Sequence, residues 1–166
     1  MAVTLSLGLY VGDLHQPHSL QVDDVGMVHR MFGIASALVV VLVNSIAVTY
    51  FVGTSRWCRE VVETYGLNAE LVRRSAVLKR RAFPWAVSAM LVVVGVSALG
   101  AAADPATRRP WTADWVLPHL IGALVGFAFI AWAFLQEWLQ IREHHAVITD
   151  ILGDVRRIRQ EQGLEV

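Results

Sequence analysis

The feature that most constrains this chain is a long stretch without charge. Residues 31–52 (MFGIASALVVVLVNSIAVTYFV) contain no charged side chain, and residues 84–103 and 115–135 have the same character. A helix rises about 1.5 Å per residue, so a helix of this length crosses the roughly 30 Å hydrocarbon core of a bilayer. The sequence therefore predicts three membrane-spanning helices.

The composition agrees with a protein that resides in lipid, because 55% of the residues are hydrophobic and the mean hydropathy is +0.51. We expect an all-α fold, an integral membrane three-helix bundle with long helices that extend into the cytoplasm. An outer N-terminal tail of residues 1–25 precedes a three-span helical domain of residues 26–163. Outside the spans, this domain has a cytoplasmic helical hairpin (53–83), an outer loop (104–114) and a cytoplasmic helix (136–163).

The distribution of basic residues predicts the orientation. Eleven Lys and Arg residues lie in 53–83 or after residue 135, whereas only three lie in 1–30 or 104–114. Lys and Arg in short loops are retained on the cytoplasmic side of a membrane. We therefore expect a multi-pass protein of the cell inner (plasma) membrane, with the N-terminus outside and the C-terminus in the cytoplasm.

The parts beyond the spans have their own local signals. Gly66 is a helix stop and Asn68 an N-cap, which predicts the turn of the hairpin. After the third span, apolar residues recur at steps of three and four among charges, as in an amphipathic helix. We interpret Glu137, Glu143, His144 and His145 there as a solvated helix surface. The composition of residues 1–25 favours turns.

Two histidines near the outer ends of two spans are candidates for chemistry. His29 follows Asp24 by five residues, and His119 follows Asp114 by five residues. Both helices start on the outer side, so we expect the two side chains at a similar depth. Two imidazoles at matched depth can ligate one metal ion or one haem iron.

Small residues follow each histidine on its own helix face. They are Gly33 and Ala37 after His29, and Gly122 and Gly126 after His119. Small residues let a flat macrocycle or another helix approach closely. Arg30 or Arg108 can pair with haem propionates at the outer interface. Two interpretations are open: helix packing with interface histidines, which the sequence favours, and a haem b site with axial His29 and His119.

Residues 26–33 (GMVHRMFG) resemble the Ser-x-x-His-Arg-x-Thr-Gly motif of the cytochrome b subunit of succinate dehydrogenase, another three-span protein. The shared residues are His29, Arg30 and Gly33, with Gly26 and Phe32 at the Ser and Thr positions. In that family the motif contacts quinone, so the resemblance implies a quinone near His29. That family begins its first helix on the cytoplasmic side, opposite to the orientation that the charges predict here.

Few other polar residues lie in or near the spans. We expect Asn44 to turn into the bundle and to hydrogen-bond to another helix, and Cys58 to be a packing residue. The spans hold no Asp, Glu, Lys or Arg, which argues against a proton-coupled carrier or a charge-selective channel. The basic residues adjoin the membrane and are mixed with acids, so we expect lipid headgroups and no nucleic acid as partners.

The sequence shows no Ser/His/Asp set, phosphate loop or CxxC motif and so no catalytic residues. The expected function is that of a non-enzymatic structural or accessory subunit, as a homo-oligomer or in a larger membrane complex. No cofactor is required by this function. The alternative is a b-type haem protein that transfers electrons to a membrane quinone.

Overall fold

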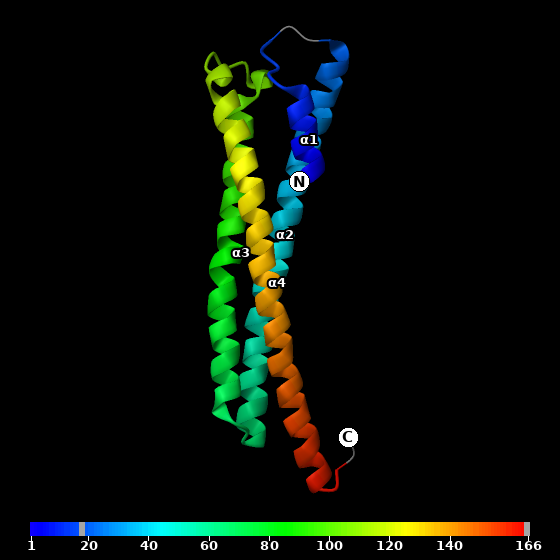
Figure 1. The fold of residues 1–166 in the computed structure, drawn as a ribbon, viewed down its shortest axis with the longest axis vertical. Coiled ribbons are helices and arrows are strands. Elements are labelled where there is room, and N and C mark those ends of the chain that lie inside the picture. The colour runs from blue at the N-terminus through cyan, green and yellow to red at the C-terminus, as the bar shows by residue number, and fades with distance from the viewer. Residues whose placement is uncertain (17–18, 165–166) are drawn as a thin grey trace. The chain divides into compact units, whose positions relative to one another are not determined.

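The computed structural model describes residues 1–16 and 19–164, and all regular structure in these residues is helical (Figure 1). The α-helices are α1 (Ala2–Val11), α2 (Leu20–Tyr65), α3 (Ala69–Ala103) and α4 (Val116–Glu161). Two short 3-10 helices, η1 (Pro105–Thr107) and η2 (Thr112–Trp115), form the connection from α3 to α4. Three helices are long and apolar enough to cross a membrane. The predicted all-α fold with three long apolar helices is confirmed.

The turn between α2 and α3 forms as the sequence predicts. Gly66 has φ 62°, a left-handed conformation that glycine adopts without strain. The backbone N–H of Leu67 then donates to the carbonyl of Val62 at 3.0 Å, which closes the end of α2. Asn68 caps α3, because its Oδ1 accepts from the backbone N–H of Glu70 at 2.9 Å.

The helices contribute to two compact units. The first unit consists of Met1–Asn44 and Ser88–Trp132, and the second of Ser45–Val87 and Ala133–Val166. Each unit therefore contains parts of α2, α3 and α4. α3 continues through Pro84.

In the first unit, α1 packs against the beginning of α2 (Figure 1). Thr4 Oγ1 lies 2.9 Å from Ser36 Oγ, and a Cβ atom on Gly8 would meet the ring of His29. These contacts run in opposite order along the two helices, so α1 is antiparallel to α2. The composition of residues 1–25 favoured turns, but Ala2–Val11 is helical. A helix satisfies its own backbone hydrogen bonds, which suits a segment without charged side chains.

In the second unit, the three long helices enclose an apolar core. Its buried members are Phe51, Cys58 and Val62 of α2, Leu71, Leu78 and Ala82 of α3, and Val147 and Ile151 of α4. They recur at steps of four or seven residues, so each helix turns one stripe toward the others. The predicted amphipathic continuation of the third span is the part of α4 in this core.

Candidate functional site

The structure brings His29 and His119 together in the first unit. Their ring centroids are 6.4 Å apart and their planes form an angle of 69°. His29 Nδ1 lies 2.9 Å from the backbone carbonyl of Thr4, to which it donates, so the lone pair of the neutral ring is on Nε2. His119 Nδ1 is buried without a hydrogen-bond partner. The two histidines, which were expected at a similar depth, thus lie in direct ring contact.

Each of these two rings lies against a glycine. A Cβ atom on Gly8 of α1 would lie 2.8 Å from Cε1 of His29, and one on Gly100 of α3 would lie 3.0 Å from Cε1 of His119. Larger residues at either position would displace the rings. The sequence analysis did not single out Gly8 and Gly100, because they lie on other helices than the histidines.

The space beside the glycines that were expected to admit a macrocycle is occupied by side chains of other helices. A Cβ atom on Gly122 would lie 2.7 Å from Leu99 Cδ1, and one on Gly126 would lie 2.7 Å from Val96 Cγ2. Both glycines therefore bring α4 close to α3. Gly33 faces α1, since its nearest side-chain atom is Cγ2 of Thr4 at 3.9 Å.

Arg30 also has a protein partner. Its Nη1 donates to Oδ1 of Asp104 at 3.2 Å, which ties α2 to the start of the loop after α3. Arg30 is therefore engaged where a haem propionate was expected. Side chains of α1 and α3 thus occupy the space beside these glycines, and the haem site itself stays a prediction. The geometry around His29 and His119 fits helix packing.

Asn44 is fully buried in the first unit, as expected, but its contact differs from the expected one. Its Nδ2 donates to the carbonyl of Val40 at 2.7 Å, one turn earlier in the same helix. Its Oδ1 has no hydrogen-bond partner. The expected bond to another helix is therefore not formed, because the amide turns back onto α2.

A buried chain of polar side chains links three helices in the second unit. Tyr50 and Ser55 belong to α2, Ser75 to α3 and His144 to α4. His144 Nδ1 lies 3.4 Å from the hydroxyl of Tyr50, and its Nε2 lies 2.8 Å from Oγ of Ser75. Ser75 in turn donates to Oγ of Ser55 at 3.0 Å.

One protonation state of His144 satisfies the whole chain. Because Ser75 donates to Ser55, its Oγ accepts from the Nε2–H of His144. The lone pair on Nδ1 then accepts from Tyr50. Burial lowers the pKa of His144 below its ordinary value, which favours this neutral form. These four side chains form a hydrogen-bonded network that joins the three helices, since each hydrogen bond in it has a defined donor and acceptor.

The interpretation of the residues after the third span as a solvated surface is wrong for two of the four. His144 is 0% exposed and Glu137 is 3% exposed, whereas Glu143 and His145 are exposed. Glu137 and His144 are seven residues apart, which places both on the face that α4 turns inward. Cys58 is buried in the same unit, and burial raises the pKa of its thiol. This burial fits its expected role in packing.

A second polar cluster, which the sequence did not reveal, lies in the first unit. His15 Nδ1 is 2.8 Å from Oδ1 of Asp13, and His15 Nε2 is 2.7 Å from Oγ1 of Thr112. Asp13 and His15 belong to the loop after α1, and Thr112 begins η2. No spacing rule links the loop to a threonine 97 residues later, so the cluster could be found only from the fold.

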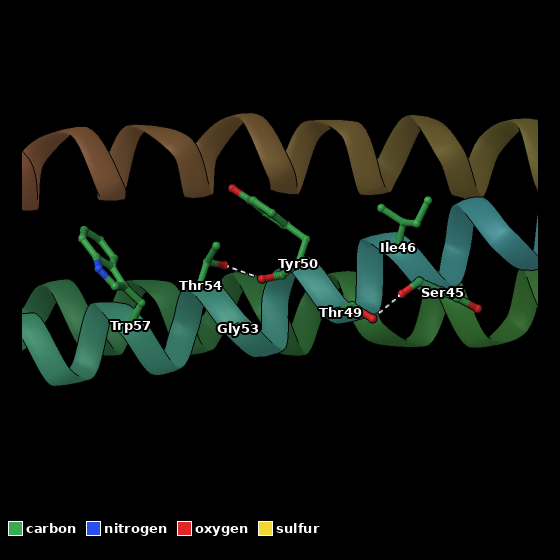
Figure 2. Close-up of a pocket in the computed structure, with 7 residues that line it drawn as sticks. All are labelled: Ser45, Ile46, Thr49, Tyr50, Gly53, Thr54 and Trp57. Carbon is green, nitrogen blue, oxygen red and sulfur yellow. Dashed lines mark hydrogen bonds between the residues drawn. The ribbon is translucent and has the colours of Figure 1, made fainter.

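The second unit also has a shallow groove of about 510 Å³ on α2 (Figure 2). The lining residues are Ser45, Ile46, Thr49, Tyr50, Gly53, Thr54 and Trp57. Thr49 donates to the carbonyl of Ser45 at 2.8 Å, and Thr54 to the carbonyl of Tyr50 at 2.6 Å. Because these hydroxyl protons are used within the helix, the groove presents a largely apolar surface.

Comparison with known proteins gives no relative from which a function could be transferred. The chain matches no protein-family model, no curated protein and no solved structure.

Proposed function

We propose that this protein is a structural membrane subunit that assembles with further copies of itself through the groove on α2. The groove supports this proposal because it is lined by a straight series of small residues on the side of α2 that faces away from the core. Ser45, Thr49 and Gly53 follow one another at four-residue steps, and all three are exposed. In lipid, such a series lets two helix backbones approach closely and pack.

The surface is open at Gly53, the last residue of this series. Trp57 projects from α2 one turn beyond Gly53, and Ile46 projects two turns before it (Figure 2). A Cβ atom on Gly53 would meet nothing within 4 Å. The open space at Gly53 leaves room for the backbone of another helix to approach.

The charges next to the groove favour a second copy as the partner. Arg56 and Glu60 continue the same face of α2 beyond Gly53, and they form an exposed ion pair with Nε and Oε1 2.8 Å apart. All copies of a chain insert into the membrane with the same orientation, so two copies of α2 pack in parallel about a two-fold axis. The Arg56–Glu60 pairs of the two copies then lie at the same level, and their four charges sum to zero.

The membrane and the orientation remain part of this proposal. The eleven basic residues of the hairpin and the C-terminal part favour the inner membrane of a cell, with these parts in the cytoplasm. The groove then lies toward the cytoplasmic end of the first span. Copies joined there would hold their second units side by side.

Filling the groove tests the proposed function. Gly53→Leu places a large side chain where the second helix would pack. In mild detergent we expect the wild-type protein to be a dimer and Gly53→Leu to dissociate at least about tenfold more readily, since overpacking costs about 1–3 kcal/mol. Light scattering coupled to size-exclusion chromatography measures the mass.

Gly95→Leu is a matched control. Gly95 lies in a span of α3, and a Cβ atom there also meets nothing within 4 Å. We expect this variant to remain a dimer. A monomeric wild-type protein, or equal dissociation of the two variants, would contradict the proposed assembly.

A further inference from the structure

Asp13, His15 and Thr112 are arranged as a general base and a nucleophile. Oδ1 of Asp13 accepts from the backbone N–H of His15 at 2.9 Å and lies 2.8 Å from Nδ1 of the same residue. The backbone hydrogen bond from His15 is the main cause that lowers the pKa of Asp13, so the carboxylate is ionised. An ionised carboxylate only accepts, which places the ring proton of His15 on Nδ1.

The lone pair of His15 is then on Nε2, where Thr112 lies. The Nε2 to Oγ1 distance is 2.7 Å, so the hydroxyl of Thr112 donates to the imidazole. A hydroxyl that donates to a histidine, which is itself oriented by a carboxylate, is the arrangement that activates serine and threonine nucleophiles. The carbonyl of Arg109 is a second acceptor for the same hydroxyl, at 3.2 Å.

The burial of the three side chains suits these roles. Thr112 is 3% exposed, whereas the side chains of His15 and Asp13 are 21% and 34% exposed. Thr112 is thus shielded from bulk water, and a substrate reaches its Oγ1 only from the side on which His15 and Asp13 are exposed. Where water is excluded, water molecules do not compete for hydrogen bonds with the attacking hydroxyl.

The surroundings indicate the class of substrate. Trp111 and Trp115 are 50% and 39% exposed beside Thr112, and the guanidinium of Arg109 lies 5.9 Å from the centre of the Trp111 ring. Tryptophan is enriched where lipid meets water. Exposed indoles next to a guanidinium suit an amphiphile with an acyl chain and a polar or anionic head.

We propose that Thr112, His15 and Asp13 form a triad that hydrolyses carboxylic esters of amphiphiles at the membrane surface. In the first step Oγ1 of Thr112 bonds to the ester carbonyl carbon, and its proton passes to Nε2 of His15. The C–O bond of the ester breaks, and the leaving alkoxide takes that proton to form the alcohol. Water then attacks the acyl-threonine, again with His15 as base, and releases the carboxylic acid and the free hydroxyl.

The test uses the full-length protein in mild detergent with p-nitrophenyl octanoate as substrate. Thr112→Val removes the nucleophile at nearly constant shape, and His15→Gln removes the base. We expect each to lose at least about 100-fold in the rate of nitrophenol release, the usual range for an activating base. Thr112→Ser retains a hydroxyl, so it should keep activity within about tenfold of wild type. A purely structural role of Thr112 would not require a hydroxyl for activity.

Two further measurements make the outcome decisive. Thr107→Val alters an exposed threonine of the same connection and should leave the rate unchanged. Rapid acid quench of the wild-type protein followed by peptide mass spectrometry should find the octanoyl group on Thr112. Full activity in Thr112→Val, a loss in Thr112→Ser equal to that in Thr112→Val, or an acyl group absent from Thr112 would overturn the proposal. The mass measurement needs no variant, so it holds even if Thr112→Val does not fold.

Discussion

The adjacent residues His144 and His145 show how far a single residue can be interpreted from sequence. Both looked like part of a charged helix surface, yet His144 is buried in a hydrogen-bonded chain and His145 is exposed. The seven-residue step from Glu137 to His144 placed both on one face, but it did not reveal that this face is the inner one. That assignment depends on Ser75 and Tyr50, which come from other helices.

This pair of histidines gives a matched test of the buried chain. His144→Leu keeps most of the side-chain volume but removes the acceptor of Tyr50 and a donor to Ser75. Leaving buried polar groups unpaired costs about 1–3 kcal/mol each, so we expect the free energy of unfolding to fall by a similar amount. Chemical denaturation in detergent, followed by helix content, measures it.

His145→Leu is the control for this prediction. His145 is exposed on the same helix, and exposed substitutions usually change stability by less than about 0.5 kcal/mol. Equal effects of the two substitutions would contradict the structural role of the chain.

At the scale of elements, the long helices were predictable and the first short one was not. The three apolar stretches, the glycine stop at Gly66 and the cap at Asn68 are local signals, and the structure confirms them. α1 carries no such signal in its own sequence. It packs on α2 through Thr4 and through the room that Gly8 leaves for His29, and both contacts join residues far apart in the chain.

Gly8 is therefore expected to control the docking of α1. Gly8→Ala adds a Cβ atom 2.8 Å from Cε1 of His29, so the ring or the helix must move. We expect α1 to open more often, with amide exchange of Ala2–Val11 about five- to tenfold faster, which corresponds to about 1 kcal/mol. Hydrogen exchange followed by mass spectrometry measures this rate.

Gly33→Ala is the matched control for α1. Its added Cβ atom would lie 3.9 Å from Cγ2 of Thr4, an ordinary contact between the same two helices. Exchange in α1 should then remain close to the wild-type rate. Faster exchange in Gly33→Ala than in Gly8→Ala would contradict the proposed role of Gly8.

For the whole molecule, the fold class followed from hydropathy, whereas the clusters of polar residues did not. The hydropathy of a segment is a sum over its own residues, so it can be calculated without knowing which helices that segment packs against. Thr112 and His15, or Ser75 and His144, meet only after the helices have packed. The candidate pair His29 and His119 lies between these extremes, since equal distances from Asp24 and Asp114 gave their depth but not the glycines beside them.

Orientation is the property of the whole molecule that the basic residues predict. Thr107 lies in the loop between α3 and α4, and Gln160 lies near the end of α4; both are exposed. With Cys58→Ser as background, we expect a membrane-impermeant maleimide to label Thr107→Cys in intact cells. Gln160→Cys should be labelled only after the membrane is permeabilised, because Arg156, Arg157 and Arg159 favour the cytoplasm for this end.

Permeabilised cells supply the control, since both cysteines should then react. The opposite pattern in intact cells would place the hairpin and the end of α4 outside, against the charge bias. It would also bring the start of α2 to the cytoplasmic side, where the family with the similar His-Arg motif begins its first helix. Asp13, His15 and Thr112 would then face cytoplasmic esters, so the labelling pattern decides which side of the membrane supplies a substrate to the proposed triad.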